Sequence, residues 1–503
     1  MSRSGILIRK YAILCHRWMG VVFCVLFAAW FLSGIVLMYW EFPVVAGHER
    51  LAHLPPLDAS RIQVPPEQAF QKLDTAMAPS QVWISMLGNR PVYRFQYGRS
   101  QRLVYADNGD VLPFVSNGLG LYLAAAWLGQ APGPALATAI AEPDQWTVYP
   151  EIRRAGPFWK YSWPNGEDVY VSQSSGEIVQ HTTRSSRLGA WLGAIPHWLY
   201  FTPLRRNTAA WRAAVIGLSG GGILATIFGL VAGVWLYSPS KRYRFPNGRS
   251  SIPYAGQKHW HTMLGLIFGL FALTWIFSGM LSMNPLQWSP DSATSEPARA
   301  LRGQPWSASP FMARQPREAL AKAPQIRAKE LELAFIAGEP VYLATEAADR
   351  TMMIPVAGDP SIEVDPLRIT RAMTIAGPGL TIAETRRVTQ YEPYYIDRHH
   401  AKPLPVLFVR LNDREQSIYY VDLRTAQVVE SYDGRSRLNR WLYHGLHSMD
   451  LPWLYRNRPA WDITVLTLMI GGNALCITSL VIGWRRVRKK IRMHRINVAM
   501  ATR

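Results

Sequence analysis

Four histidines stand at matching positions in the two halves of this 503-residue chain. His16 and His261 each begin an apolar run and are 245 residues apart, whereas His197 and His447 each precede another apolar run and are 250 residues apart. A neutral imidazole is a good metal ligand, and a haem b iron accepts paired histidines. We therefore expect two haem b sites, with His16 paired to His261 and His197 paired to His447.

The residues around these histidines repeat with the same spacing. The first repeat begins His-Arg-Trp-Met-Gly at residue 16 and His-Thr-Met-Leu-Gly at residue 261, and its later members are Trp30, Ser33 and Gly34, matched by Trp275, Ser278 and Gly279. The second repeat surrounds His197 and His447, and its other members are Trp191, Arg206, Asn207 and Trp211, matched by Trp441, Arg456, Asn457 and Trp461. This pattern predicts a duplicated unit of helix, outer domain and helix, with one haem toward each face of a membrane.

Each histidine also has a simpler interpretation. His16 and His261 could lie in the lipid headgroup region beside basic neighbours, and His197 and His447 could be interfacial capping residues. Ionisable residues at membrane depth are costly and usually functional, and the duplication favours ligation. His444 has no repeat partner and is a possible substitute for His447 as a ligand.

Four stretches are apolar and long enough to cross a membrane, which takes about 20 residues for a hydrocarbon layer of about 30 Å. They cover residues 17–40, 212–237, 262–283 and 462–484. We therefore predict an integral membrane protein with four transmembrane helices.

Much of the net charge of +20 lies in three segments that flank these stretches and contain no Asp or Glu. Their basic residues are Arg3, Arg9, Lys10, Arg17, Lys241, Arg242, Arg244, Arg249, Lys258, Arg485, Arg486, Arg488, Lys489, Lys490, Arg492, Arg495 and Arg503. Short basic flanks stay on the cytoplasmic side, so both termini and the middle loop are predicted to be cytoplasmic. Topology thus explains the charge, and no nucleic-acid partner is expected.

The predicted order of segments follows from this topology. It comprises a cytoplasmic N-terminus with the first transmembrane helix (1–40), a first outer domain (41–205), the second helix (206–240), a cytoplasmic loop (241–258), the third helix (259–283), a second outer domain (284–458), the fourth helix (459–484) and a basic cytoplasmic tail (485–503). All three cysteines, Cys15, Cys24 and Cys476, fall in or beside the helices, so the outer domains contain no disulfide. The chain has no Asn-x-Ser/Thr acceptor, which agrees with a bacterial inner membrane and periplasmic outer domains.

Both outer segments combine helix and strand signals, which indicates α+β domains. A helix is predicted from Pro65-Pro66, where the prolines suit a first turn. Strands are predicted at 81–86, 91–97, 101–106, 158–163, 168–173, 340–345, 405–412 and 417–422. Residues 286–325 are rich in Pro, Ser, Ala and Arg and are predicted to form a loosely ordered connector, whereas 118–141 is interrupted by Gly and Pro and is predicted to lie outside the bilayer.

Several of these motifs resemble a known family. Residues 65–112, with Tyr-Arg-Phe at 93 and Tyr-Ala-Asp-Asn-Gly-Asp at 105, resemble a PepSY domain, and the segments from Tyr170 and Tyr420 are similar to its strand and turn element. The His-Arg-Trp-Met-Gly start and the Ser-Gly end of the first apolar run resemble the PepSY-associated transmembrane family. That resemblance implies two periplasmic PepSY-like domains and a relation to iron-regulated inner-membrane proteins and ferric-siderophore reductases.

The expected function is that of a di-haem b electron carrier that delivers electrons to a periplasmic acceptor, with a ferric siderophore complex as the candidate substrate. The cytoplasmic segments are too short for a flavin or nicotinamide domain, so the electron donor must be a quinol or a separate reductase. A contrasting hypothesis is a non-redox PepSY protein that binds a periplasmic partner or restrains a peptidase. A transporter is disfavoured because the helices carry no mid-membrane carboxylate.

Overall fold

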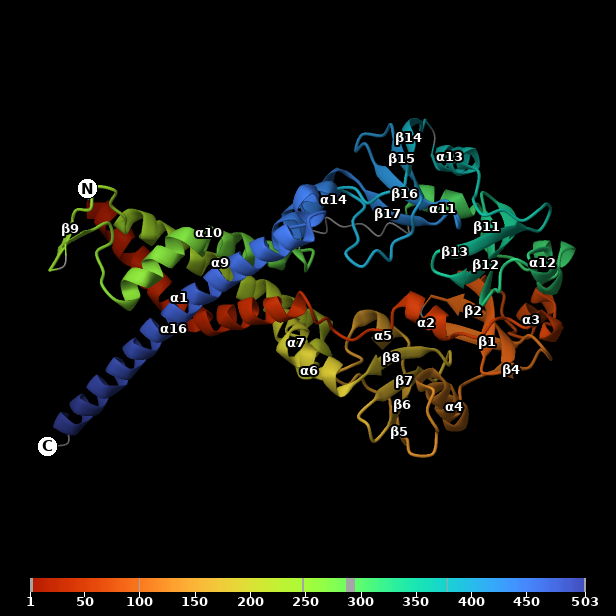
Figure 1. Cartoon of the computed structure of the whole chain (residues 1–503), viewed down its shortest axis with the longest axis horizontal. Helices are drawn as coiled ribbons and strands as arrows, with labels where there is room; N and C mark the ends of the chain where they lie inside the picture. Colours follow the sequence, from red (N-terminus) through yellow and green to blue (C-terminus); the bar gives the residue numbers. More distant parts are fainter. Residues whose placement is uncertain (1–2, 99, 247, 286–294, 378, 502–503) are drawn as a thin grey trace. The chain divides into compact units, whose positions relative to one another are not determined.

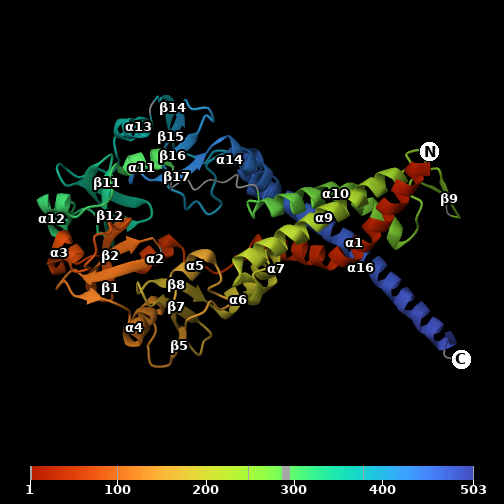
Figure 2. The same cartoon turned by 180° about the vertical axis from the view of Figure 1, so that it is seen from behind.

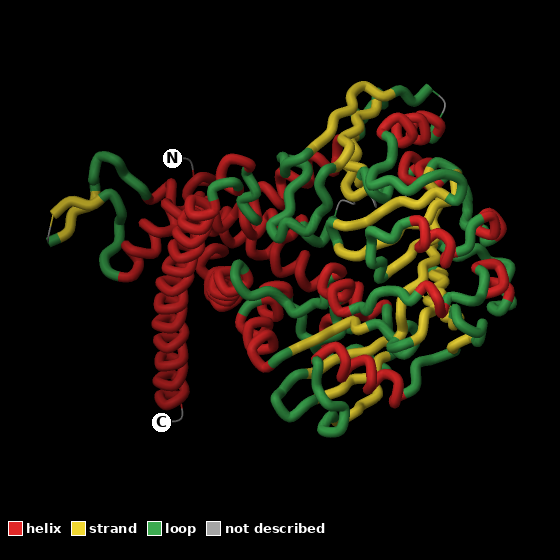
Figure 3. Tube along the Cα trace, turned by 45° about the vertical axis from the view of Figure 1, so that its right-hand side comes forward, coloured by secondary structure: helices red, strands yellow, loops and turns green. Residues whose placement is uncertain are grey.

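The computed structural model describes residues 3–98, 100–246, 248–285, 295–377 and 379–501, and the chain divides into two compact units. The first, here called the helical unit, comprises Met1–Phe42, Ser185–Trp288 and Leu438–Arg503. The second, here called the sheet unit, comprises Pro43–Arg184 and Ser289–Arg437. Strands occur mainly in the sheet unit (Figure 3).

Four long helices form the helical unit: α1 (Arg3–Leu37), α9 (Thr208–Leu236), α10 (Gln257–Leu281) and α16 (Arg458–Ala501). Each contains a stretch long and apolar enough to cross a membrane, and these are the four such helices in the described residues. They run alongside one another in two opposite views (Figures 1 and 2), and α1 and α10 each contact both α9 and α16. The four predicted transmembrane helices are therefore present as a closed bundle.

Glycines allow the four helices to approach closely. A Cβ atom on Gly221 would lie 2.5 Å from the ring of Phe23, and one on Gly471 would lie 2.3 Å from the ring of Phe268. Such distances leave room only for hydrogen, so the aromatic rings on α1 and α10 pack directly against the backbones of α9 and α16.

Short elements connect the long helices. They are α6 (Arg184–Leu192), α7 (Ala194–Trp198) and α8 (Thr202–Arg205) before α9, the β9–β10 hairpin (Tyr243–Phe245 and Gly248–Ser250) between α9 and α10, and α14 (Gly434–Asn439), the π-helix η4 (Arg440–Gly445) and α15 (Pro452–Tyr455) before α16. The helix α16 continues beyond the predicted span, which ended at residue 484, through the basic tail to Ala501. Its 44 residues correspond to a length of about 66 Å.

One antiparallel sheet of seven strands joins the two outer segments in the sheet unit, in the order β13-β12-β11-β1-β2-β3-β4. The strands are β1 (Gln81–Leu87), β2 (Arg90–Tyr97), β3 (Ser100–Tyr105), β4 (Val111–Leu112), β11 (Glu330–Ile336), β12 (Glu339–Ala347) and β13 (Arg350–Pro355). The junction is the pairing of β1 with β11, with Ile84 opposite Leu331. The two outer segments therefore share a sheet, which the order of strands along the chain did not predict.

Helices and 3-10 turns cover this sheet. On one face, Tyr93, Phe95 and Tyr342 are buried with Phe311 and Trp306 in a common core. The helices and 3-10 turns of the whole unit are α2 (Gly47–His53), η1 (Ala59–Arg61), α3 (Pro66–Gln71), α4 (Asn117–Leu128), α5 (Pro150–Arg154), α11 (Glu296–Arg302), η3 (Ser309–Ala313), α12 (Pro316–Lys322) and α13 (Pro366–Ile375).

Each outer segment also contributes a sheet of four strands. One has the order β5-β6-β7-β8 and the other β14-β15-β16-β17. The strands are β5 (Leu136–Ile140), β6 (Phe158–Ser162), β7 (Asp168–Ser172), β8 (Ile178–Thr182), β14 (Ile382–Val388), β15 (Val406–Leu411), β16 (Ile418–Asp422) and β17 (Val428–Tyr432).

The last hairpins of these two sheets have the same register 250 residues apart. Tyr170 pairs with Gln180 and Tyr420 with Glu430, and each hairpin shifts register at the next position. Gly176 has φ 70° in the first turn, and Ala426 adopts φ 53° in the second. The second turn therefore forms with alanine, at the modest cost of a left-handed conformation for a residue that carries a Cβ.

The expectation of a loosely ordered connector at 286–325 is wrong for the part that the structure describes. Residues 286–294 lie outside the described residues, but α11, η3 and α12 follow, and Leu301, Trp306 and Phe311 are buried. Prolines at the first turns of these helices favour helix rather than disorder. In the stretch 118–141, α4 ends at Gly129 in a left-handed conformation and β5 follows, and neither element is among the candidate membrane spans.

Candidate functional site

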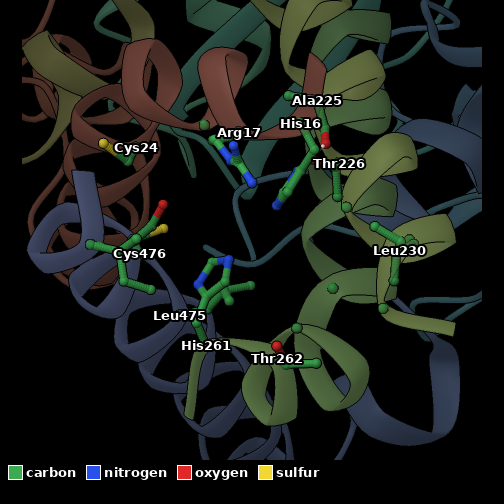
Figure 4. Close-up of a pocket in the computed structure, with 18 of the residues that line it drawn as sticks. His16, Arg17, Cys24, Ala225, Thr226, Leu230, His261, Thr262, Leu475 and Cys476 are labelled. Atoms are coloured by element: carbon green, nitrogen blue, oxygen red, sulfur yellow. Dashed lines mark hydrogen bonds between the residues drawn. The ribbon is translucent and has the colours of Figure 1, made fainter. Parts of the chain in front are cut away.

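The first histidine pair joins α1 to α10. The ring centroids of His16 and His261 are 6.1 Å apart, and the ring planes differ by 27°. Figure 4 shows the two imidazoles on opposite sides of a pocket between the helices. The structure thus brings together the two residues that the repeat matched.

Hydrogen bonds hold both rings of the first pair in a defined orientation. His16 Nδ1 lies 3.0 Å from the Ala225 carbonyl oxygen, and His261 Nδ1 lies 3.2 Å from Thr478 Oγ1. A carbonyl oxygen only accepts, so a neutral His16 carries its proton on Nδ1. Thr478 donates its hydroxyl proton to the Leu475 carbonyl at 2.7 Å, which leaves its oxygen to accept from His261 Nδ1. In each ring, Nε2 is then the nitrogen that carries a lone pair.

The pocket around the first pair has a volume of about 290 Å³ and is lined by all four long helices. Its walls include Phe23, Phe27 and Phe31, and no Asp or Glu is among the described residues that line it. Six of the lining residues are glycines: Gly20, Gly229, Gly233, Gly265, Gly269 and Gly483. A Cβ on Gly229 would lie 2.5 Å from His16 Cε1, so the ring occupies the space that any side chain at this position would need.

The second pair joins the connecting segments that precede α9 and α16. His197 lies in α7 and His447 follows η4, and their ring centroids are also 6.1 Å apart, with an interplanar angle of 51°. His197 is outside the long helices, and burial lowers its pKa to about 4, so its imidazole is neutral at ordinary pH.

The hydrogen bonds of the second pair are the same in both halves. His197 Nδ1 lies 3.1 Å from the Trp30 carbonyl oxygen and 3.2 Å from Ser33 Oγ. His447 Nδ1 lies 3.2 Å from the Trp275 carbonyl oxygen and 3.2 Å from a serine, Ser278 Oγ. Each serine donates its own proton to the tryptophan carbonyl of its half, so its oxygen can accept from the histidine.

The Ser-Gly pairs at the ends of α1 and α10 therefore support the second pair of histidines. The glycine of each also leaves space for a ring, since a Cβ on Gly34 would lie 3.2 Å from His197 Cε1 and one on Gly279 would lie 3.1 Å from His447 Cε1. In the sequence these residues stand out only as members of a repeat. Their fixed spacing from the histidines was the signal, but their role depends on contacts between distant segments.

His444, the possible substitute ligand, lies beside Tyr443, with ring centroids 4.5 Å apart. The ring that faces His197 belongs to His447. Among the described residues, no group of three or more His, Cys, Asp or Glu side chains could hold a metal ion. Each pair instead brings two imidazoles to a centroid separation of 6.1 Å.

A comparison with protein families identifies the chain. The family described as the PepSY-associated TM region matches residues 13–375. The chain belongs to this family. The match covers both members of the first pair and His197, whereas His447 lies beyond it. A search of curated proteins found no match. The resemblance predicted from the first apolar run is thus confirmed at the level of the family.

Proposed function

We propose that this PepSY-associated membrane protein is a di-haem b electron carrier of the bacterial inner membrane. The observation that supports the proposal is the geometry of the two histidine pairs. An iron bound at about 2 Å from each imidazole nitrogen, with each nitrogen about 1 Å from its ring centroid, separates the two centroids by about 6 Å. Both pairs have a centroid separation of 6.1 Å.

The surroundings of each pair suit a flat porphyrin. A haem would bring four of the iron's ligands in its own porphyrin ring, so a site that offers two histidines would complete the coordination. Gly20 and Gly265 line the first pocket, where a Cβ on either would meet no atom closer than 3.7 Å, so a planar ring could approach the backbone there. Trp30, whose carbonyl supports His197, has its indole Nε1 buried without a hydrogen-bond partner in the described structure, and a group held beside the ring would satisfy this donor.

In this proposal the residues around each pair orient the imidazoles, exclude water and influence the redox potential. The Nδ1 hydrogen bonds fix the orientation of each imidazole and would leave Nε2 to bind a haem iron. The apolar walls formed by Phe23, Phe27 and Phe31 keep water away from the first site. When bound, a haem supplies one-electron redox chemistry. The two histidines that would hold it, their hydrogen bonds and the burial of the site would set its potential.

The two sites lie at different depths along the bundle. His16 and the Trp30 carbonyl that supports His197 are 14 residues apart in α1, which corresponds to about 21 Å along a helix. The first pair is therefore assigned to the cytoplasmic half of a layer about 30 Å thick and the second pair to the outer half. Groups held by the two pairs would then lie toward opposite faces of this layer.

Aromatic side chains fill the region between the pairs. Phe23 contacts Phe27 at a centroid distance of 5.8 Å, and Phe27 contacts Trp30 at 6.1 Å. Phe31 packs against Trp275 at 5.8 Å. These rings keep the path between the sites closely packed and free of bulk water.

We assign the donor to a quinol or a separate reductase and the acceptor to a ferric chelate in the periplasm. The basic segments of the chain are assigned to the cytoplasm by the positive-inside rule. Reduction would release iron from oxygen-donor chelators because Fe(II) binds hard oxygen ligands less tightly than Fe(III). The sheet unit, with 142 residues from the first outer segment alone, is the part assigned to the periplasm.

A reduced-minus-oxidised optical spectrum of the detergent-purified protein tests the proposal, with haem quantified per chain. We expect a b-type spectrum with about two haems per chain. His16→Ala and His261→Ala should each remove the same haem, and His197→Ala and His447→Ala the other. His444→Ala and His259→Ala are matched controls on histidines outside the pairs. A colourless protein from cells with ample haem would refute the electron-carrier function and support the partner-binding alternative.

A further inference from the structure

Three basic side chains line the pocket of the first histidine pair. They come from three helices: Arg17 from α1, Lys258 from α10 and Arg486 from α16. Figure 4 shows Arg17 pointing into the space between His16 and His261. We call these three residues the basic cluster.

The basic cluster has no counter-charge in the described part of the chain. The residues that line the pocket include no carboxylate, and none of the ion pairs of the described residues involves the cluster. Arg17 and Arg486 lie close enough to repel each other. Like charges assembled at one cavity are unfavourable unless an anion completes the site.

The basic cluster also breaks the internal repeat. The positions that match Arg17, Lys258 and Arg486 in the other half are occupied by uncharged residues that line the same pocket: Thr262, Ile13 and Leu236. At Thr262, Ile13 and Leu236, uncharged side chains line the pocket, so packing of the helices there does not require a charge. The three cations are thus confined to one copy of each position, and two of them, Arg17 and Arg486, lie close to each other.

We propose that the basic cluster binds the two propionate carboxylates of a haem held between His16 and His261. This inference rests on the proposed function. The two guanidinium groups can each bind a carboxylate through two parallel hydrogen bonds, and the lysine adds a point charge. The cluster is thereby a positioning device, because it selects one rotation of the porphyrin about the axis through the two imidazoles.

The neighbouring tail supports this assignment by restraining Arg486. Its guanidinium lies 5.4 Å from the centroid of the Trp18 ring, and Lys490 Nζ lies 5.0 Å from the same centroid. Such cation–π contacts hold a basic side chain in place without neutralising it. Arg486 therefore remains available to an anion in the pocket.

The test compares haem with its dimethyl ester, which lacks free carboxylates. The protein is prepared without haem in a His197→Ala background, so that only the first pair is complete, and each porphyrin is titrated in detergent by its Soret absorbance. We expect the free diacid to bind at least about tenfold more tightly than the diester, as charge-assisted hydrogen bonds would produce. The double variant Arg17→Gln/Arg486→Gln should reduce this ratio to within about twofold.

Two control variants show whether the difference in affinity depends on a charge at the pocket or on the total charge of the protein. Arg488→Gln removes the same charge from α16 at a position that does not line the pocket, and it should keep the full ratio. Arg17→Lys keeps a positive charge and should retain most of the difference in affinity between the diacid and the diester. Size-exclusion profiles of all variants establish that each remains folded.

Several outcomes would overturn the inference. Equal affinity for diacid and diester in the parent, or an unchanged ratio in the double variant, shows that the cluster does not bind the propionates. If phosphatidylglycerol added to the detergent raises the thermal stability of the parent but not of the double variant, while the ratio is the same in both, the cluster binds lipid headgroups instead. Binding of neither porphyrin with His16 and His261 intact would refute the proposed function itself.

Discussion

Replacing Gly229 with alanine should remove the haem that we propose for the first pair and leave the one proposed for the second pair in place. The added Cβ would lie 2.5 Å from His16 Cε1 and 2.8 Å from Nδ1, whereas ordinary carbon contacts begin near about 3.5 Å. The ring must therefore move by about 1 Å. The bond from Nδ1 to the Ala225 carbonyl, now 3.0 Å, would then exceed the limit of a hydrogen bond.

The size of the effect follows from this displacement. Loss of an outer hydrogen bond to a metal-bound histidine typically lowers metal affinity by about 10–100-fold. Movement of Nε2 by about 1 Å away from the axis between the two imidazoles weakens the iron bond further. We therefore expect the haem content to fall from about two per chain to about one.

The assay is haem quantification together with a redox titration that resolves the two potentials. The matched control is Gly220→Ala in the same helix, where a Cβ would meet no atom within 4 Å. This control should keep both haems. Full occupancy of both sites in the Gly229→Ala protein would refute the argument that this glycine holds open the space for the His16 ring.

Three further predictions concern single side chains. Thr478→Val keeps the shape of the side chain but removes the acceptor for His261 Nδ1, so haem affinity at the first pair should fall by about 10–100-fold in a Soret titration. Burial raises the pKa of Glu332 to about 7, so its contribution to the free energy of unfolding is complete below about pH 4.5 and is lost as pH rises toward 7, by up to about 3 kcal/mol. The melting temperature should therefore fall between pH 4.5 and pH 8 by more in the parent than in Glu332→Gln. Gly303→Ala should destabilise the sheet unit by about 1–3 kcal/mol, measured by urea unfolding of the full chain, because Gly303 has φ 85° and its Cβ would lie 2.4 Å from the backbone nitrogen of Gly338.

Each of these predictions has a matched control and a contrary result. Thr226→Val alters a threonine that lines the same pocket but does not bind His261, and equal losses in both variants would contradict the role of the Thr478 hydroxyl. Parallel pH curves for the parent and Glu332→Gln would show that this carboxyl does not titrate differently on folding. Gly118→Ala adds a Cβ where no atom lies within 4 Å, and a loss there as large as in Gly303→Ala would contradict the steric argument.

Much of the local structure could be predicted from patterns that are short in sequence. The strands predicted at 81–86 and 91–97 form β1 and β2, and the four apolar runs form long helices, because alternation and hydropathy act within a segment. Residues 286–325 were predicted to be a loosely ordered connector because of their composition, which is rich in Pro and Ala. Its helices depend on burial of Trp306 and Phe311 against strands that lie further along the chain.

The sequence by itself determined the membrane helices, the family and the four histidines that a repeat marks as special. Only the tertiary structure decided that the His16 and His261 rings face each other at 6.1 Å, that Ala225 and Thr478 orient them, and that β1 pairs with β11 across the two outer segments. Hydropathy is a property of neighbouring residues along the chain, and a repeat is visible when two short segments are compared. Distances of a few ångströms between residues 200 or more positions apart are instead set by how whole helices and strands pack, which no single segment encodes.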